Sequence, residues 1–465
     1  MEIFRFKNLG RWDKFTIPHL HFPSHVPSEQ IGRLLRPRDE RVDKSLWKFE
    51  NLQPITIHFG GDISRRKVTV GREYTLPLLW VRPGDVVLSK IDLKNGAVGV
   101  LADGWDNAVV TTHFKVYEPD LKRLDPTYFR MLLQTAEFKR WLWANRSGAD
   151  GRTEVKLPVF EELEIPLPPL PEQQAIVAAW RAALDHAAAL ELEAAATETA
   201  AGLAFESALG FTPSIPLPNR PMFVANFKDI DRWSHEGILR GIVDGGTTYA
   251  SPWPMVKMGD VIADLENGWS PNCLGRMAEP EEWGVLKLGA VSFGTFNETE
   301  NKALPKHLKP RPYLEVKTGQ ILISRANVTR LVGAITLIGE TRDKLMLCDK
   351  IFRVVPMDPA PIDPVFLTEV LRLSDLRRQI ESKVTGTSPT MKNISKPALL
   401  GLTFPLPPLP EQQKMVQALT DARTSGVQKR EDAAQARAQA WADFEAAVYA
   451  AEDVQDAAPL IAAAS

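Results

Sequence analysis

The stretch Pro166-Leu-Pro-Pro-Leu-Pro-Glu-Gln-Gln174 occurs a second time, 239 positions later, as Pro405-Leu-Pro-Pro-Leu-Pro-Glu-Gln-Gln413. Identity over nine consecutive residues does not arise by chance at this complexity, and a period near half the chain length indicates a duplicated architecture. Consecutive prolines fix φ and withhold backbone donors, so each copy is expected to end a folded block.

The sequence before each copy repeats as well. Val81-Arg-Pro-Gly-Asp-Val-Val-Leu-Ser-Lys90 parallels Val316-Lys-Thr-Gly-Gln-Ile-Leu-Ile-Ser-Arg325, and Phe6-Lys-Asn-Leu-Gly-Arg-Trp12 parallels Phe227-Lys-Asp-Ile-Asp-Arg-Trp233. A proline-rich linker used twice does not explain matches this far from the linker. The chain is therefore predicted to hold two related halves.

Each half has the same predicted order of elements. Turn dipeptides and short β-branched runs such as Val86-Val-Leu88 predict strands. Apolar residues at helical spacing then predict one short helix, over Tyr128 to Trp141 in the first half and over Phe366 to Ile380 in the second. The Pro-rich stretch follows, and a long helix begins directly after it.

The first long helix begins near Glu172, where the chain becomes Ala-rich and free of proline for about 38 residues, or about 57 Å of helix. Residues at alternating spacings of four and three form a seam along it, namely Ile176, Trp180, Ala183, Ala187 and Leu190. The second, from Glu411, carries Met415, Leu419, Trp441, Phe444 and Val448, with Gly426 as an expected weak point. Because these seams are rich in small residues, the two helices are expected to pack closely on each other.

The composition argues against a disulfide-rich, a secreted and a membrane-spanning protein. The chain has 465 residues, 44% of them hydrophobic, and only two cysteines, Cys273 and Cys348, which is too few for a disulfide scaffold. The first residues lack an apolar signal core, and no stretch approaches 18 uninterrupted apolar residues. We therefore expect a cytoplasmic protein with no membrane partner.

Charge alternates along the chain, although the formal net charge is only -2. Residues 1–160 carry 26 basic and 19 acidic side chains, and residues 209–404 carry 24 and 21. The two helical stretches are acidic, with 1 basic and 9 acidic side chains in 161–208 and 5 and 9 in 405–465. Basic blocks can approach nucleic-acid phosphates, whereas the acidic helices suit protein partners or solvent.

The repeated PLPPLPEQQ motif leading into a long helix, preceded each time by a variable mixed block, resembles the specificity subunit of type I restriction-modification systems. The resemblance extends over essentially the whole chain. It implies an α+β fold in which two mixed target recognition domains alternate with two long helices that pair as an antiparallel coiled coil. It also implies a non-catalytic reader of double-stranded DNA that recruits two methyltransferase subunits and, through them, restriction subunits. S-adenosylmethionine, ATP and Mg would then belong to those partners, and this chain would hold no cofactor and no metal.

The same resemblance assigns residue ranges. The first target recognition domain is expected over 1–165, with its Pro-rich turn and spacer helix over 166–209. The second domain is expected over 210–404, its turn and helix over 405–452, and an Ala-rich tail over 453–465.

Candidate DNA-contacting residues are cations beside small hydroxyl or amide side chains, because Arg and Lys can donate to guanine or phosphate oxygens and Asn can bridge adenine N6 and N7. They are Arg65, Arg66, Lys67, Ser89, Lys90, Arg152, Lys156, Ser324, Arg325, Thr387, Lys392 and Asn393. The helix starts are candidate contacts for partner subunits, namely Pro171, Glu172, Gln173, Gln174, Pro410, Glu411, Gln412 and Gln413.

An alternative function is a stand-alone Mg²⁺-dependent nuclease. Asp120 after Pro119, with Glu137 and Lys139, matches a loose PD…ExK pattern, but that chemistry usually places the ExK residues on a strand, whereas Glu137 lies in a helical pattern. The histidines at 19, 21 and 25 lack a nearby cysteine or carboxylate to complete a tetrahedral metal site. No Walker A sequence, methyltransferase NPPY or NPPF motif, or Gly-rich cofactor fingerprint occurs.

Overall fold

A computed structural model describes residues 20, 22, 25–66, 76–147, 154–211, 222, 224–225, 238–239, 251–386 and 391–449. The chain divides into two compact units. Unit 1 combines residues 1–190 with 431–465, and unit 2 comprises residues 191–430. Each unit therefore contains one mixed domain and a part of both long helices. The residue boundaries proposed above for domains and spacer helices stay a prediction.

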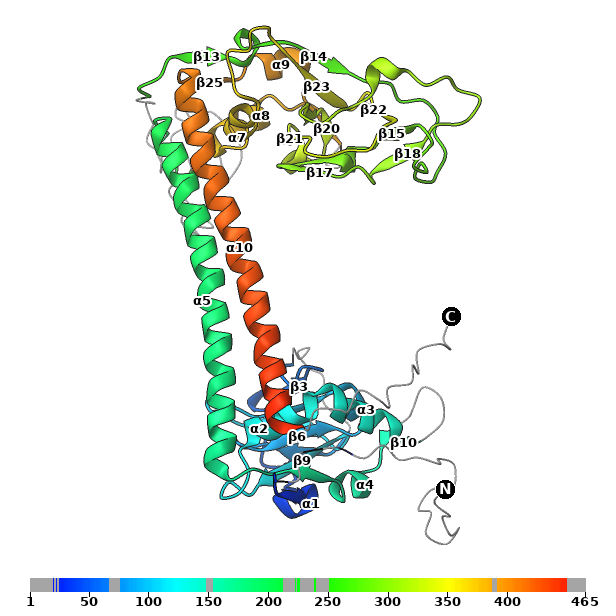
Figure 1. Cartoon of the computed structure of the whole chain (residues 1–465), viewed down its shortest axis with the longest axis vertical. Helices are drawn as coiled ribbons and strands as arrows, with labels where there is room; N and C mark the ends of the chain where they lie inside the picture. Colours follow the sequence, from blue (N-terminus) through cyan, green and yellow to red (C-terminus); the bar gives the residue numbers. More distant parts are fainter. Residues whose placement is uncertain are drawn as a thin grey trace. The chain divides into compact units, whose positions relative to one another are not determined.

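The domain of unit 1 is built on two four-stranded sheets (Figure 1). The first has the order β2-β9-β6-β7, formed by Leu35–Pro37, Phe114–Pro119, Val86–Ser89 and Val98–Val100. The second has the order β4-β3-β8-β5, formed by Ile63–Arg65, Gln53–Ile57, Ala108–Thr111 and Leu78–Trp80. The helices are α1 (Ile31–Leu34), α2 (Pro126–Gln134), α3 (Ala136–Ala144) and α4 (Leu157–Glu161), and the short pairs are β1 (Ser28–Gln30) with β12 (Glu164–Pro166) and β10 (Arg146–Ser147) with β11 (Glu154–Val155).

The domain of unit 2 repeats this plan. Its four-stranded sheet has the order β14-β23-β19-β21, formed by Ile262–Asn267, Ile351–Pro356, Ile321–Ser324 and Ile335–Leu337. Its second sheet has three strands in the order β18-β15-β22 (Asn301–Ala303, Gly284–Leu286, Leu345–Met346). The other elements are the pairs β13–β25 (Met255–Lys257, Thr403–Pro405), β16–β17 (Val291–Ser292, Thr295–Phe296) and β20–β24 (Ala326–Asn327, Lys392–Asn393), and the helices α7 (Pro364–Val370), α8 (Ser374–Ser382) and α9 (Lys396–Leu400).

The central strands β6 and β19 show why the sheets form. All four residues of each strand are buried, so both faces of the strand are covered. Each strand is preceded by a turn with a left-handed glycine, Gly84 at φ 86° and Gly319 at φ 82°. The backbone N–H of Arg82 donates to Asp85 Oδ2 at 2.9 Å, and that of Lys317 donates to Gln320 Oε1 at 3.0 Å. The repeat read from the sequence is therefore a repeat of turn and strand geometry.

The short helix expected near the end of each block is interrupted. In unit 1 the chain forms α2 and α3, because Thr135 adopts an extended backbone and its side chain accepts from Phe138 N as the N-cap of α3. In unit 2 the corresponding break between α7 and α8 lies at Leu373, which is also extended. The prediction of a single helix was wrong at these two positions, since apolar spacing continues across the break.

The long helices α5 (Leu170–Ala208) and α10 (Leu409–Val448) begin at the repeated motif, as predicted. Small seam residues such as Ala187, Ala194 and Ala433 have no exposed surface. The helix continues through Gly426, so the predicted weak point does not break it. A Cβ atom at Gly426 would lie 2.2 Å from Glu198 Oε1, which shows that this glycine permits close approach of the two helices.

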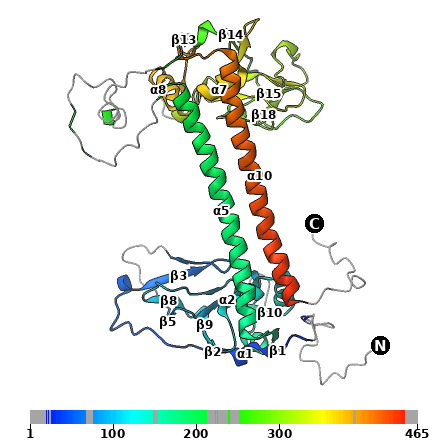
Figure 2. The same cartoon turned by 60° about the vertical axis from the view of Figure 1, so that its left-hand side comes forward.

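The helices pair as an antiparallel coiled coil, as expected, and each unit shows its own part of the pairing (Figure 2). In unit 1 the start of α5 meets the end of α10, where the rings of Trp180 and Trp441 lie 6.0 Å apart. In unit 2, Lys429 pairs with Glu193 and Arg430 donates two hydrogen bonds to Glu198.

The end of the opposite helix completes each core. In unit 1, Phe444 of α10 packs edge-on against Tyr128 of α2, with ring centroids 5.9 Å apart. In unit 2, Phe205 of α5 packs in the same way against Phe366 of α7, at 5.8 Å. Each domain is thus held by the start of one long helix and the end of the other.

A buried carboxylate fastens α10 to α7 in unit 2. Glu369 has 8% of its surface exposed and accepts two hydrogen bonds from Arg423, at 2.8 and 2.7 Å, and one from Arg372. We expect Arg423→Met to lower the free energy of unfolding of unit 2 by about 1–2 kcal/mol, because the buried Glu369 carboxylate then keeps only Arg372 as a partner. The loss is limited to this range because Arg423 is partly exposed to solvent. Urea denaturation measures it, with Lys429→Met as the control, for which a loss below about 1 kcal/mol is expected. Equal losses would contradict the special role of the buried carboxylate.

Candidate nucleic-acid interface

Two predicted pairs of residues occupy equivalent places in the two domains. Ser89 and Lys90 stand at the end of β6, and Ser324 and Arg325 stand at the end of β19. The N–H of Ser89 donates to Ala97 O at 2.9 Å, and that of Ser324 donates to Ala334 O at 2.8 Å. Both serines are buried, so they position the chain, while the following cation is half-buried and reaches the surface.

In the second domain the structure brings two further candidates, Lys392 and Asn393, to this strand end. Strand β24 pairs with β20, so Asn393 lies opposite Ala326 and Lys392 opposite Asn327. The guanidinium of Arg325 donates to Asp349 O at 3.3 Å and lies 5.5 Å from the Phe352 ring. Arg325, Lys392 and Asn393 therefore form one cluster, which we call the β19 cluster.

In the first domain the candidate DNA-contacting residues lie on several different elements. Lys90 Nζ donates to Thr112 O at 2.8 Å, and Ser89 Oγ accepts from Asp92 N. Lys156 is exposed at the N-cap of α4. Arg65 and Arg66 are exposed at the end of β4, in the other sheet. The candidates Lys67, Arg152 and Thr387, and the histidines at 19 and 21, lie outside the described residues.

The eight residues proposed at the helix starts fall into two groups, buried and accessible. Gln173 and Gln412 are completely buried. Gln173 Oε1 accepts from Asp125 N at 2.9 Å, and its Nε2 donates to Arg123 O and Pro168 O at 2.8 and 2.7 Å. Gln412 makes the matching bonds to Asp363 N, Pro361 O and Pro407 O at 2.8, 3.2 and 2.8 Å. These two glutamines tie each long helix to the N-cap residue of its own domain's helix.

The remaining residues of the two motifs present the accessible surface. Pro171, Glu172, Gln174, Pro410 and Gln413 are exposed, and Glu411 is half-buried. A partner subunit that binds the helix starts would therefore meet these six side chains. These six residues remain the candidate contacts for a partner subunit.

Unit 2 also contains a cationic groove that the sequence reasoning missed. A cavity of about 720 Å³ is lined by residues from two loops, among them Trp269, Asn272, Lys306 and His307. The guanidinium of Arg311 lies 4.0 Å from the centre of the Trp269 ring. The basic run Lys306-His-Leu-Lys-Pro-Arg311 was the available signal, but its aromatic partner is 42 positions away in the sequence.

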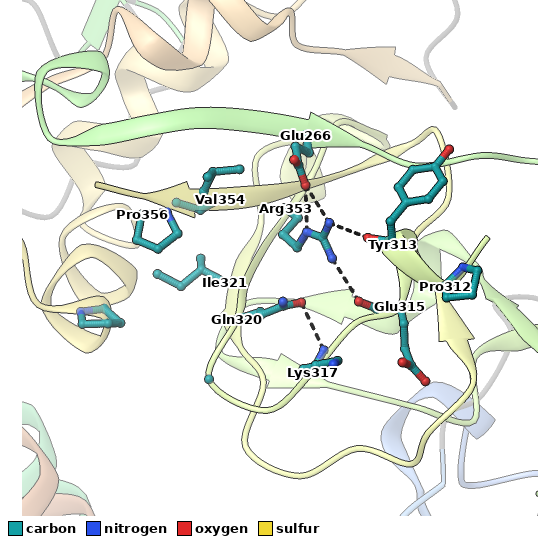
Figure 3. A pocket seen from close by; sticks show the side chains of 13 residues that line it. Glu266, Pro312, Tyr313, Glu315, Lys317, Gln320, Ile321, Arg353, Val354 and Pro356 are labelled. Atoms are coloured by element: carbon teal, nitrogen blue, oxygen red, sulfur yellow. Dashed lines mark hydrogen bonds and ion pairs between the residues drawn. The ribbon is translucent and has the colours of Figure 1, made fainter. Parts of the chain in front are cut away.

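A second cavity, of about 520 Å³, lies beside β14, β19 and β23 (Figure 3). Arg353 at its wall donates to Glu266 Oε2 at 2.6 Å, to Tyr313 O at 2.9 Å and to Glu315 O at 2.9 Å. Its guanidinium is thus engaged by the fold itself, and it joins the loop that contains Tyr313 to the main sheet. We assign this cavity a structural role.

Among the buried or half-buried charges of the first domain with shifted pKa values, Asp85 and Lys139 belong to segments discussed above. Burial raises the pKa of the Asp85 carboxyl, against the lowering effect of the Arg82 N–H and of Arg38. Burial also lowers the pKa of the Lys139 ammonium. Asp85 belongs to the turn before β6, so its perturbation reflects structure. The second domain has the neutral Gln320 at this place.

The nuclease alternative is not supported. Asp120 follows β9 and its Oδ1 accepts from Lys122 N, while Glu137 stands in the first turn of α3 and Lys139 on the same helix. Within the described ranges, no group of three or more His, Cys, Asp or Glu residues could hold a metal ion. Among the same residues, no helix is long and apolar enough to cross a membrane.

Comparison with known proteins finds two matches to part of the sequence. Residues 80–190 match the family described as "Type I restriction modification DNA specificity domain". The chain is also 35% identical over 172 residues to the type I restriction enzyme EcoEI specificity subunit of Escherichia coli. Part of the chain is therefore similar to the specificity subunits of type I restriction-modification systems. Specificity subunits are non-catalytic and generally have no cofactor of their own.

The extent of each match differs. The alignment with the E. coli subunit covers 36% of this chain and 28% of that relative, so the chain matches less than a third of the relative's length. A crystal structure of the HsdS subunit from Thermoanaerobacter tengcongensis superimposes with a TM-score of 0.51 over 92% of this chain and 97% of that chain, at 18% identity. A structure titled for complex assembly and conformational transition of the type I R-M system gives 0.53 over 91% and 97%, also at 18% identity. These two likenesses show the fold alone.

Proposed function

We propose that this chain is the specificity subunit of a type I restriction-modification system, that it recognises a bipartite double-stranded DNA target, and that each mixed domain reads one half-site. The observation that carries the proposal is the equivalent placement of Lys90 and Arg325 after the buried strands β6 and β19. One recognition surface per domain follows from this repetition. A cation held by its backbone at the end of a rigid strand is suited to contact phosphate or a base edge.

The proposed partners follow from the same repetition. Two copies of the exposed helix-start surface would bind two methyltransferase subunits, and restriction subunits would attach through these. S-adenosylmethionine, ATP and Mg²⁺ would be bound by the partners. The candidate DNA contacts are the β19 cluster with Ser324 in the second domain, and Ser89, Lys90, Lys156, Arg65 and Arg66 in the first. Lys67, Arg152 and Thr387 remain candidates from sequence.

A domain exchange tests the proposal. Residues 25–165 are replaced by the corresponding domain of another family member, and methylated adenines are mapped by sequencing the host genome. We expect one half of the target to change completely and the other half, with the gap between them, to stay the same. The reciprocal exchange of residues 251–404 should change the other half. A change in both halves after a single exchange would contradict independent reading by the two domains.

A further inference from the structure

The stack of Arg311 on Trp269 is built on a fixed frame. The N–H of Trp269 donates to Leu347 O at 3.0 Å, and that of Gly268 donates to Cys348 O at 3.1 Å. Gly268 is required for this approach, because a Cβ atom there would lie 1.8 Å from Leu347 O. The backbone N–H of Arg311 contacts Met346 Sδ at 3.2 Å. Both members of the stack are therefore held against the segment that begins with β22.

Stacking leaves the guanidinium of Arg311 available. Arg311 is exposed, and no salt bridge or side-chain hydrogen bond involves its guanidinium in the part of unit 2 that the structure describes. A guanidinium that lies against an aromatic face keeps its N–H donors directed outward in its own plane. Because the ring restricts its rotamers, less conformational entropy is lost when these donors bind an acceptor.

The charged residues around Arg311 and Trp269 favour the binding of a polyanion. Lys306 lines the groove, and Lys302 and Lys309 lie within four positions of it in the sequence. All three are exposed, and none forms a salt bridge with a described carboxylate. The neighbouring Glu282 and Glu281 are occupied by Arg276 and Lys344. The groove of about 720 Å³ is thus lined by Lys306, the indole of Trp269 and the amide of Asn272, with Arg311 against the Trp269 ring.

The groove adjoins the β19 cluster through two residues. Ser270, next to Trp269, hydrogen-bonds to the side chain of Asp349, whose backbone carbonyl accepts from Arg325. The first domain contains the same pair of residue types, with Arg65 lying 5.6 Å from the Trp105 ring. An arginine beside a tryptophan ring is thus present in both domains.

We infer that Arg311, preorganised by Trp269, reads a guanine of the half-site recognised by the second domain by donating to its O6 and N7. This inference rests on the proposed function and adds the identity of one base-reading side chain. Arginine matches the two acceptors of guanine in the major groove, whereas lysine offers a single point charge. The cations at 302, 306 and 309 would contact the flanking phosphates, which adds affinity without sequence preference.

The test uses the full chain in complex with its methyltransferase subunits and duplexes that contain the cognate target or a scrambled one. Arg311→Ala should weaken binding to the cognate duplex by about 10- to 100-fold and to the scrambled duplex by less than about 3-fold. Arg311→Lys should not restore the preference, and Trp269→Phe should retain more of it than Trp269→Leu. Lys309→Ala is the matched charge control and should weaken both duplexes equally.

Base analogues identify the contact. Single guanines of the half-site are replaced by 7-deazaguanine, which lacks the N7 acceptor. At one position this replacement should weaken DNA binding by the unchanged complex. At the same position it should cause no further loss of affinity in the Arg311→Ala complex. Equal loss on both duplexes, an intact preference, or additive effects at every guanine would overturn the inference while leaving the proposed function in place. A complex of the unchanged chain that prefers no sequence would overturn both.

Discussion

Replacing Gln412 by leucine is expected to lower the free energy of unfolding of unit 2 by about 3–6 kcal/mol. The side chain is completely buried and serves three backbone groups, namely Asp363 N, Pro361 O and Pro407 O. Leucine fills a similar volume but leaves these three groups without a partner, and each unsatisfied buried group costs about 1–3 kcal/mol. The change would remove a large share of the stability of a typical domain.

Urea denaturation followed by hydrogen exchange of the α7 amides measures this loss. Gln413→Leu is the matched control, because its side chain is exposed one position further along the same helix turn, and a change within about 0.5 kcal/mol is expected. Gln173→Leu should reproduce the effect in unit 1, since its three hydrogen bonds have the same geometry. A loss at Gln412 no larger than at Gln413 would show that water replaces the missing contacts.

The repeated motif predicted the fold because it combines several local signals. Prolines that cannot continue a strand are followed by a residue suited to the first helical turn, and both long helices begin there. The seam spacing predicted the buried faces, as Ala187 and Phe444 show. The role of Gly426 was not predictable from its helix propensity, because that role depends on Glu198 of the other helix. Interhelical distance is a tertiary property.

The candidate site was predictable where the two halves match each other. Lys90 and Arg325 were proposed because each is a cation that follows a serine, in two segments that match between the halves, and they lie at equivalent strand ends. The identical glutamines were noticed too, but the sequence does not distinguish a buried capping side chain from an exposed one. Arg311 and Trp269 lie outside the segments that match between the halves, so no internal comparison pointed to them. Long-range stacking of this kind requires coordinates.

A heptad inserted into both long helices should lengthen the gap between the half-sites. Seven residues are added after Leu190 in α5 and seven after Arg430 in α10, which are the positions where the chain divides into its two units. The insertion adds about 10.5 Å of helix and returns the seam to the same face, so the contacts within each unit are kept. At about 3.4 Å per base pair this corresponds to at most about three base pairs, and fewer if the helices cross the duplex obliquely.

Methylome sequencing of the host that carries this variant measures the gap directly, and both half-site sequences should stay unchanged. Seven residues inserted into α5 alone serve as the control. That change leaves α10 too short to pair along its whole length, and the pairs Trp180–Trp441 and Glu198–Arg430 are no longer satisfied together. We therefore expect the single insertion to abolish most methylation. An unchanged gap in the double insertion would mean that the helices do not set the distance, and altered half-site sequences would mean that they take part in reading bases.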